Sequence, residues 1–413
     1  MKGRAESPKG FRRWVSGGDV AAYGLIVVAV LLGWQIVLQP LIQRASVQAV
    51  VGLAPTSPTV LRRAAESELA AGRVDNAAQL SRDALLRSPF DVRALRVLGL
   101  TEARSGREDI ADDILTLAGN WSLRDDPTHA WLTERRLRQG DYASSFAHAD
   151  TLVRRRRDIQ PQVFSMFTLA GIQDPKRALP VLARLLTARP PWRTDYLNGL
   201  RRTPQELQLA ANLTILLEEG RAPLTNDELQ ELYWALLRQS QFPALIAIRE
   251  RIKRPPPRAL SNGDFADPEA PQPFQWRLYQ KAGVVPEVVA DDLRPSNPAL
   301  RVQYNGYAAG VIVEQLTFLS PGSHRFSAEV RIESGEPHAP LSWTLSCAPG
   351  DNGMTRVPVE PSSTTPSIWT TLSGRFDVPT NCPAQWLRLA TRANDRRSPT
   401  VVWFDGIAIS EGQ

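Results

Sequence analysis

Six aromatic residues in the last third of the sequence could bind a ring-shaped ligand: Tyr304, Tyr307, Trp343, Trp369, Trp386 and Trp403. Flat apolar rings with hydrogen-bonding neighbours can hold the C–H faces of sugars. Strand alternation places Trp386 and Trp403 among buried aliphatic residues. The candidate carbohydrate-binding residues are therefore Tyr304, Tyr307, Trp343 and Trp369, with Tyr304 and Tyr307 in the loop-like stretch QYNGYAAG the better exposed. The alternative is that all six rings pack the interior.

The only two cysteines, Cys347 and Cys382, lie in the same region of the chain. An even number of cysteines in an exported chain favours a disulfide bond between them. Two buried free thiols are the alternative if this region faces the cytoplasm. Two cysteines are too few for a tetrahedral zinc site, and neither a CxxC motif nor a neighbouring pair of histidines supports one.

Motifs for catalysis are missing from the sequence. The four histidines, at positions 129, 148, 324 and 338, show no metal-ligand spacing such as HExxH. There is also no GxSxG nucleophile motif, no GxxxxGK[ST] phosphate loop and no GxGxxG after a strand. We therefore expect a protein that is not an enzyme and that requires no cofactor.

The elements that must position these residues begin with an uncharged run, residues 20–43. As a helix, these 24 residues would reach about 36 Å, which is enough to span a bilayer. Five basic residues lie in the segment 1–19, whereas only Arg44 follows the run closely. The positive-inside rule then predicts a cytoplasmic tail at 1–19, a transmembrane anchor at 20–43 and an extracytoplasmic remainder. A cleaved signal peptide is the alternative, although its apolar core would be shorter.

Arginine accounts for the net charge of +6, since the chain has only five lysines. The densest basic run, Arg154–Arg157, is interpreted as a solvated helix face or helix end, and an anionic partner is the alternative. Because most of the chain is predicted to lie outside the cytoplasm, we do not expect a nucleic-acid partner.

A 34-residue repeat follows the predicted linker at 44–58. Gly72, Gly106 and Gly140 recur at this interval, and two pairs of alanines share it: Ala77 with Ala111, and Ala84 with Ala118. Glycine allows a tight turn between two helices, and alanine lets helices approach closely. These intervals resemble the tetratricopeptide repeat. They predict a tetratricopeptide-like α-solenoid over residues 59–253, a fold whose concave face usually binds a protein partner.

The pattern changes after a proline-rich hinge at 254–259. Residues 260–413 contain alternating segments at 311–318, 324–332, 341–347, 368–378, 385–391 and 401–409, separated by Pro, Gly, Asn and Ser. This region predicts a C-terminal antiparallel β-sandwich of the jelly-roll type. The fold class is therefore multi-domain α and β, with a single N-terminal transmembrane helix.

Three short stretches carry a resemblance: NGDF at 262–265, PFQW at 273–276 and FDGIAI at 404–409. They are similar to the galactose-binding-like jelly rolls that include many carbohydrate-binding modules. This resemblance implies that the sandwich binds glycans. It also implies a structural calcium ion held by Asp264 and Asp405, whose carboxylate oxygens suit that ion.

The combination of anchor, solenoid and sandwich resembles the tetratricopeptide proteins of Gram-negative envelope polysaccharide systems. It implies a non-catalytic periplasmic adaptor in the bacterial inner membrane, active in exopolysaccharide or capsule assembly or export. The expected partners are a protein in the solenoid groove and an envelope polysaccharide on the sandwich. The alternative is a protein-only scaffold of a secretion or division complex, in which the sandwich is purely structural.

Overall fold

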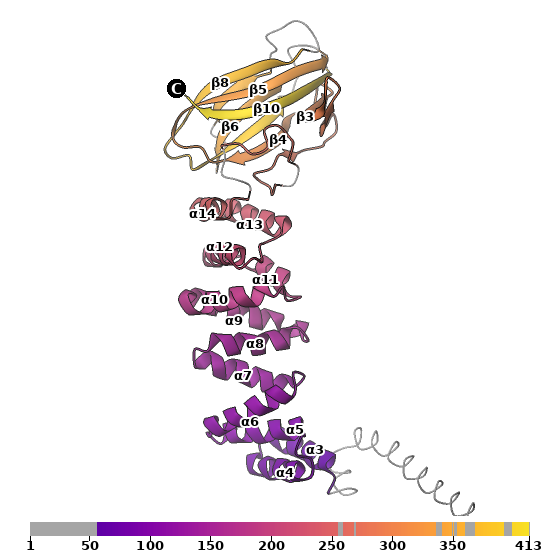
Figure 1. Cartoon of the computed structure of the whole chain (residues 1–413), viewed down its shortest axis with the longest axis vertical. Helices are drawn as coiled ribbons and strands as arrows, with labels where there is room; N and C mark the ends of the chain where they lie inside the picture. Colours follow the sequence, from indigo (N-terminus) through magenta and orange to yellow (C-terminus); the bar gives the residue numbers. More distant parts are fainter. Residues whose placement is uncertain are drawn as a thin grey trace, which may run out of the picture. The chain divides into compact units, whose positions relative to one another are not determined.

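Twelve α-helices are followed by ten β-strands in the part of the chain that the computed structural model describes (Figure 1). This part comprises residues 56–254, 259–267, 270–335, 341–348, 350, 353–359, 368–391 and 399–412. The order of helices and then an antiparallel sandwich confirms the sequence prediction. The chain divides into two compact units, which meet at residues 152 and 153 and are described separately.

The predicted tail at 1–19 and anchor at 20–43 lie outside the described residues. Within the described ranges, no helix combines the length and the apolar character needed to cross a bilayer.

The first unit contains α3 (Pro58–Ala70), α4 (Val74–Arg87), α5 (Val92–Arg104), α6 (Glu108–Trp121), α7 (Asp126–Arg138) and α8 (Tyr142–Val153). The repeated glycines lie in the turns that follow α3, α5 and α7. Gly72, Gly106 and Gly140 have φ angles of +79°, +77° and +71°, a left-handed conformation that glycine adopts without strain. The 34-residue interval is therefore the interval between successive turns of the same kind.

Small residues at the repeat positions allow the helices to pack closely. Ala77, Ala111 and Ser145 occupy equivalent positions, and each is 0% exposed. A Cβ atom on Gly99 of α5 would lie 2.6 Å from the Leu115 side chain of α6, so this contact needs a glycine.

The helices of the second unit are η1 (Arg157–Ile159), α9 (Gln160–Gln173), α10 (Pro175–Thr187), α11 (Arg193–Gly199), α12 (Pro204–Glu219), α13 (Asn226–Arg238) and α14 (Phe242–Ile252). Two of them begin as the sequence predicts. Thr203 and Glu206 form a capping box on α12, and Thr225 and Glu228 form one on α13.

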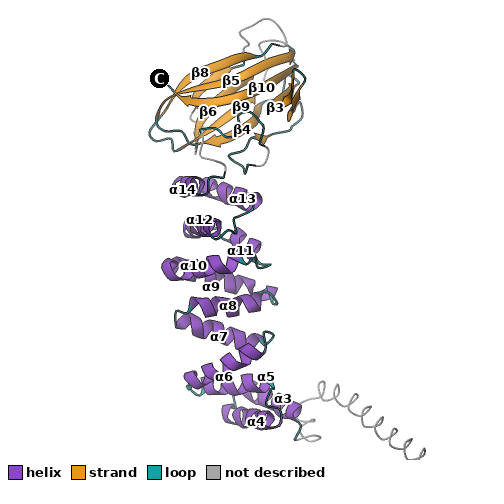
Figure 2. Ribbon diagram, viewed as in Figure 1, coloured by secondary structure: helices purple, strands orange, loops and turns teal. Residues whose placement is uncertain are grey.

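The strands of this unit are β1 (Arg277–Leu278), β2 (Val284–Asp291), β3 (Arg294–Tyr304), β4 (Gly310–Thr317), β5 (Gly322–Ser334), β6 (Leu341–Ala348), β7 (Gly353–Pro358), β8 (Thr370–Val378), β9 (Ala384–Thr391) and β10 (Thr400–Glu411). They form two antiparallel five-stranded sheets (Figure 2). Sheet A has the order β1-β4-β9-β6-β7, and sheet B has the order β2-β3-β10-β5-β8.

Buried side chains from both sheets fill the space between them, with the fully buried Trp343 packed against Phe326 and Phe404. The Cys347–Cys382 disulfide is present and joins β6 to the segment before β9. The sandwich therefore has its own core, closed by a covalent link.

The NGDF stretch is a structural loop that closes the sandwich. The Asn262 side chain bonds the backbone of Asp267 in both directions, and the Trp276 indole N–H donates to the Asn262 carbonyl. Phe265 is buried against the Trp276 ring. Gly263 accepts a hydrogen bond from the Ile407 N–H, which ties the loop to the last strand.

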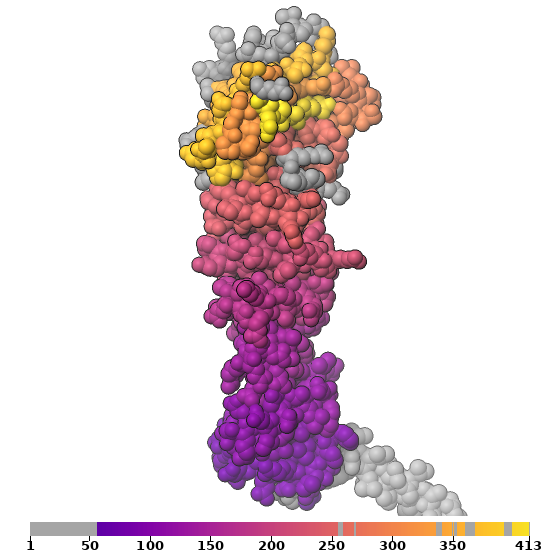
Figure 3. All heavy atoms as spheres, turned by 60° about the vertical axis from the view of Figure 1, so that its left-hand side comes forward, coloured from indigo at the N-terminus to yellow at the C-terminus, as the bar shows by residue number. Residues whose placement is uncertain are grey.

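Helices α13 and α14 pack on the sandwich, and their surfaces are continuous with it in Figure 3. The buried Tyr233 ring of α13 lies edge-on to Phe274 at 5.1 Å, and the Arg249 guanidinium of α14 lies 4.4 Å from the centre of the Phe274 ring. Burial lowers the pKa of Arg249 to about 10, so this side chain remains a cation at neutral pH.

Candidate functional site

One row of side chains crosses all five strands of sheet A. The register pairs the row members in turn across neighbouring strands: Arg277, Glu314, Arg388, Thr344 and Arg356. Residues that pair across antiparallel strands point to the same face of the sheet. The flanking Leu387 and Leu389 lie in the core, so this row faces away from it. We call this surface the outer face of sheet A.

Glu314 is the electrostatic centre of the row. Its carboxylate accepts hydrogen bonds from the Arg388 Nε at 3.0 Å and from the Tyr279 hydroxyl, and the Arg277 guanidinium lies 3.9 Å away. Burial, followed by the hydrogen bond to Glu314, raises the pKa of Tyr279 to about 12. Tyr279 therefore remains a neutral hydrogen-bond donor at all physiological pH values.

Aromatic rings continue this face toward α13. Trp386, the register partner of Ser346, stacks on Trp234 of α13 with a centroid distance of 6.1 Å and an interplanar angle of 21°. The Arg388 guanidinium lies 5.2 Å from the Trp386 ring, and the Arg277 guanidinium lies 5.2 Å from Trp234. These cation–π contacts orient the guanidinium groups along the face.

A hollow of about 420 Å³ opens over the middle of the same face. It is lined by Val311, Thr344, Leu345, Ser346, Gly353, Met354, Thr355, Arg356, Arg388 and Ala390. Hydroxyl and guanidinium groups thus surround a partly apolar floor. This combination can both hydrogen-bond a polar ligand and contact its apolar parts.

Two of the sequence-predicted candidates are buried. Tyr304 is 3% exposed because it is the last residue of β3, paired with Thr400 on one side and Val284 on the other. Trp343 is 0% exposed because it lies between the sheets. The expectation of an exposed Tyr304 was therefore wrong, and Trp343 cannot contact a ligand at the surface.

Trp369 already takes part in an internal network. Its indole N–H donates to Asp291 at 3.2 Å, and the Arg294 guanidinium lies 4.7 Å from its ring. Asp291 is 1% exposed and also accepts from the Arg331 guanidinium. These contacts with residues of β2, β3 and β5 give Trp369, which lies just before β8, a structural role on sheet B.

Tyr307 is the candidate that lies at the surface, with 52% of its area exposed. It follows Asn305, whose side chain accepts hydrogen bonds from the N–H groups of Tyr307 and Ala308. The Asn305 side chain thus holds the backbone of this loop, and a role of the Tyr307 ring in binding stays a prediction.

The proposed calcium ligands do not fit that ion. The Asp405 carboxylate accepts from the Asn297 amide at 2.6 Å and lies 3.5 Å from the Arg294 guanidinium. Asp264 is exposed, and the described residues contain no group of three or more His, Cys, Asp or Glu side chains that could hold a metal ion. A guanidinium beside the carboxylate disfavours a divalent cation, so the predicted calcium site is not supported.

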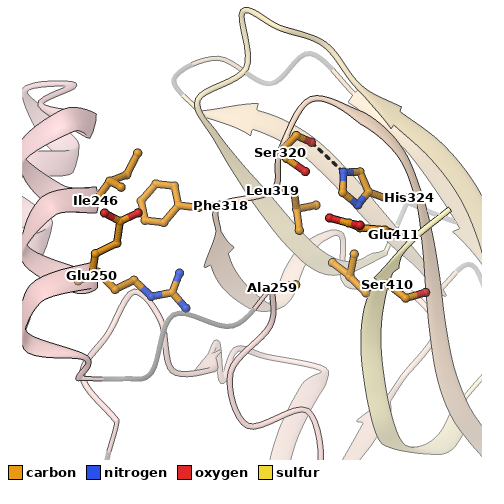
Figure 4. Close-up of a pocket in the computed structure, with 11 residues that line it drawn as sticks. Ile246, Glu250, Ala259, Phe318, Leu319, Ser320, His324, Ser410 and Glu411 are labelled. Atoms are coloured by element: carbon orange, nitrogen blue, oxygen red, sulfur yellow. Dashed lines mark hydrogen bonds between the residues drawn. The ribbon is translucent and has the colours of Figure 1, made fainter.

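A second pocket lies between α14 and the sandwich, with Ile246, Glu250 and Phe318 on one side and His324, Ser410 and Glu411 on the other (Figure 4). The His324 Nε2 lies 2.8 Å from the Ser320 carbonyl, which can only accept, so this nitrogen carries a proton. The imidazole is 3% exposed and stacks on Phe376. We therefore interpret this pocket as part of the junction between helix and sandwich.

The sequence predicts that Trp386 and Trp403 are buried, and both are, with 9% and 3% of their areas exposed, but neither belongs to the core between the sheets. Trp386 and Arg388 alternate with Leu387 and Leu389, and the leucines are the core residues. Trp386 is only 9% exposed because Trp234 covers it, and it is not part of the core between the sheets. In the same way, Trp403 lies beside Arg301 and Arg331 on the outer face of sheet B.

Comparisons with known proteins found similarity in solved structures alone. No protein-family model matches the sequence, and no curated protein matches it. A CBM4 carbohydrate-binding module shares 12% identity, with 37% of this chain and 99% of that chain covered and a TM-score of 0.29. TmCBM61, solved with β-1,4-galactotriose, shares 16% identity over 38% of this chain and 99% of that chain, with a TM-score of 0.27.

The CBM22-1 xylan-binding domain of Xyn10C from Paenibacillus barcinonensis shares 16% identity over 33% of this chain and 86% of that domain, with a TM-score of 0.25. Similarities of this size assign no ligand to the chain.

Proposed function

We propose that the sandwich binds glycan chains on the outer face of sheet A and that the protein is a non-catalytic adaptor in exopolysaccharide or capsule assembly or export. The observation that carries this proposal is the row Arg388, Thr344 and Arg356 around a hollow with a partly apolar floor. Hydroxyl and guanidinium groups can hydrogen-bond the hydroxyl groups of a sugar, while the apolar floor of the hollow contacts its C–H groups.

The charges of the hollow favour glycans with carboxylate groups. Arg356 and Arg388 line it, whereas none of its described lining residues is acidic. The nearby Glu314 is 6% exposed and is engaged by Arg388 and Tyr279. A planar guanidinium binds a carboxylate through two parallel hydrogen bonds, so uronic-acid units suit this surface better than neutral sugars.

Titration of the full chain with acidic and neutral oligosaccharides of equal length tests this proposal. We expect saturable binding of a polyuronate that weakens with added salt, because salt screens exposed charges. Equal binding of a neutral glucan would refute the preference for acidic sugars. No binding to either class or to the host's own polysaccharides would refute the glycan-binding function itself.

The helices supply a candidate surface for the proposed protein partner. A groove of about 450 Å³ lies between α9, α11 and α12, where Leu169 is 53% exposed and Ile172 is 38% exposed. Exposed apolar side chains in a groove favour protein binding. If the groove alone supports function and the hollow is dispensable, the protein is a scaffold of a secretion or division complex, which is our second candidate function.

Leu169→Asp separates these two functions when it is compared with Gln208→Asp, an exposed position of α12 outside the groove. We expect loss of a co-purified partner in the first variant and retention in the second. Loss of all function with intact glycan binding would favour the scaffold, whereas an unchanged set of partners in Leu169→Asp would exclude this groove.

The location at the bacterial inner membrane, with the bulk of the chain in the periplasm, also remains a proposal. It is supported by the charge asymmetry around residues 20–43. A reporter that is active only in the periplasm should work when fused after Gln413. Activity of a cytoplasm-only reporter at the same position would refute both the topology and the access to envelope glycans.

A further inference from the structure

An exposed apolar patch lies at one end of the helices in the first unit. We define the turn patch by its side chains, which come from the α4–α5 and α6–α7 turns and from the helix ends beside them: Leu86, Phe90, Leu117, Trp121 and Leu123. Leu86 is 80% exposed, Phe90 79% and Leu123 65%. Apolar residues this exposed, when they are contiguous, mark an interaction surface.

A contact between two aromatic rings joins the two turns. The rings of Phe90 and Trp121 lie in contact, with 5.5 Å between their centroids. Leu117 and Trp121 are four residues apart on α6 and therefore share one helix face. Consecutive helices joined by short turns run in opposite directions, so the α4–α5 and α6–α7 turns lie at the same end of the helical hairpins.

Three arginines lie close to patch members in the sequence. Arg87, Arg93 and Arg124 are exposed and stand one to three residues from patch members. In the described part of the chain, none of the three forms an ion pair with a carboxylate, although the Arg87 Nη1 donates to the Asp83 carbonyl.

The acidic residues of the same turns are engaged within the unit. Asp91 caps α5 and lies 3.5 Å from Arg62, and the buried Asp125 pairs with Arg96. Asp113, one turn before Leu117 on α6, is also exposed, so three exposed arginines stand near the patch against this one exposed aspartate. The outward charge is positive on balance, which complements an anionic surface.

The size and composition of the patch fit a lipid surface better than a protein. A protein interface of standard size has about 20–30 residues on each side, and the turn patch has five apolar side chains. Leucine, phenylalanine and tryptophan beside arginine are the residues that insert at the boundary between headgroups and acyl chains.

The sequence also places this unit close to a membrane. Helix α3 begins at Pro58, so 14 residues separate it from the end of the predicted anchor at residue 43. Fully extended, they reach at most about 50 Å. This proximity rests on the proposed anchor, whereas the chemistry of the patch does not.

We propose that the turn patch docks on an anionic membrane surface, with Phe90, Trp121 and Leu123 entering the headgroup region and the arginines contacting lipid phosphates. A membrane contact at this end of the unit would limit the positions that the rest of the chain can reach.

A single fluorescent label can test this proposal in the full chain, because both native cysteines are in the disulfide. Phe90→Cys carries an environment-sensitive dye, and the protein is placed in nanodiscs of phosphatidylcholine alone or mixed with phosphatidylglycerol. We expect a blue-shifted emission and quenching by brominated lipid in the anionic nanodiscs. A label at Ser105→Cys, in the exposed α5–α6 turn at the opposite end of the hairpins, should show neither.

A charge-reversal variant tests whether the arginines contact the lipid phosphates. Arg87→Glu, Arg93→Glu and Arg124→Glu together should remove the difference between the two lipid mixtures at the residue 90 label. Equal burial of this label in both lipid mixtures, before and after the charge reversal, would contradict the proposed preference for an anionic lipid surface. Burial without lipid that rises with protein concentration would identify a second copy as the occupant and would also overturn the proposal.

If the chain does not insert into nanodiscs, the predicted anchor is wrong, and the same labels are then read with vesicles of the two lipid mixtures added to the protein in solution. An unshifted residue 90 label in that assay refutes the patch independently of the anchor.

Discussion

Gly263 holds the loop before the sandwich against the last strand. A Cβ atom at this position would lie 1.9 Å from the Ile407 carbonyl oxygen, which is backbone and cannot move aside. We expect Gly263→Ala to lower the free energy of unfolding of the sandwich by about 3 kcal/mol, the upper range for overpacking. Denaturant unfolding followed by tryptophan fluorescence measures this change. Gly353→Ala, where a Cβ would meet no atom within 4 Å, is the matched control and should change little.

His129 and His148 form a pair in the first unit, with their Nδ1 atoms 3.0 Å apart. Burial, followed by the charge of His129, lowers the pKa of His148 to about 4 from its ordinary 6.5. Because the folded state binds the proton less well than the unfolded state, this contribution to stability is complete above about pH 6.5 and is lost as the pH falls toward 4.

Unfolding midpoints measured between pH 7 and pH 4 should therefore fall less in His148→Gln than in the wild type. If the unfolding midpoints of the two proteins fell equally with pH, His148 would not titrate between pH 7 and pH 4.

Side-chain types alone could not locate the binding candidates. Tyr304 lies beside a glycine and an asparagine, which suggested a loop, yet it pairs with Thr400 at the end of β3. Its burial depends on strand β10, almost a hundred residues later in the chain. Trp386 is buried as expected, but it is covered by Trp234 on the outer face, because the sequence does not show which of two alternating sets of residues faces the core.

Glycines in the repeat give the first unit its turns. Gly106 has a φ angle of +77°, in the left-handed region where a Cβ is strained. Gly106→Ala should therefore cost about 1 kcal/mol of stability. Gly106→Asn should cost less, since asparagine tolerates this conformation better. Thermal unfolding of the two variants measures both losses of stability. Equal losses in Gly106→Ala and Gly106→Asn would indicate a cause other than backbone strain.

Most of the helices and strands could be predicted because their patterns are local. The capping boxes at Thr203 and Thr225 define two helix starts without any tertiary contact. By contrast, the predicted segments do not include β1, β2, β3 or β7, and both β2 and β3 contain prolines. Pro298 is tolerated in β3 because β10 pairs only with residues 300–304, which leaves one side of the strand open there.

The disulfide connects the sandwich across 35 residues of sequence. Loop-closure entropy for a link of this length corresponds to about 3–4 kcal/mol. Cys347→Ser should lower the free energy of unfolding of the sandwich by up to this amount while leaving the first unit unchanged. Hydrogen exchange measured on peptides from both units distinguishes this result from a global loss of structure.

At the scale of the whole molecule, the order of helices and sandwich could be predicted, but the binding face could not. The outer face of sheet A combines β1, β4, β9, β6 and β7, which come from distant parts of the chain. Trp234 reaches Trp386 from α13. The sequence does not show which strands lie side by side, so the row from Arg277 to Arg356 emerges only from the register.

Calorimetric titration of the full chain with the host's acidic surface polysaccharide tests the glycan-binding proposal most directly. Three proteins are compared: the wild type, the double variant Thr344→Val with Arg356→Ala, and the single variant Arg325→Ala. Arg325 is an exposed arginine of sheet B and controls for general charge. We predict saturable binding that the double variant weakens about tenfold or more, the effect of losing one charged hydrogen bond, while Arg325→Ala stays close to the wild type. Equal affinity in all three proteins, or no saturable binding in the wild type, would contradict a glycan site on the outer face of sheet A.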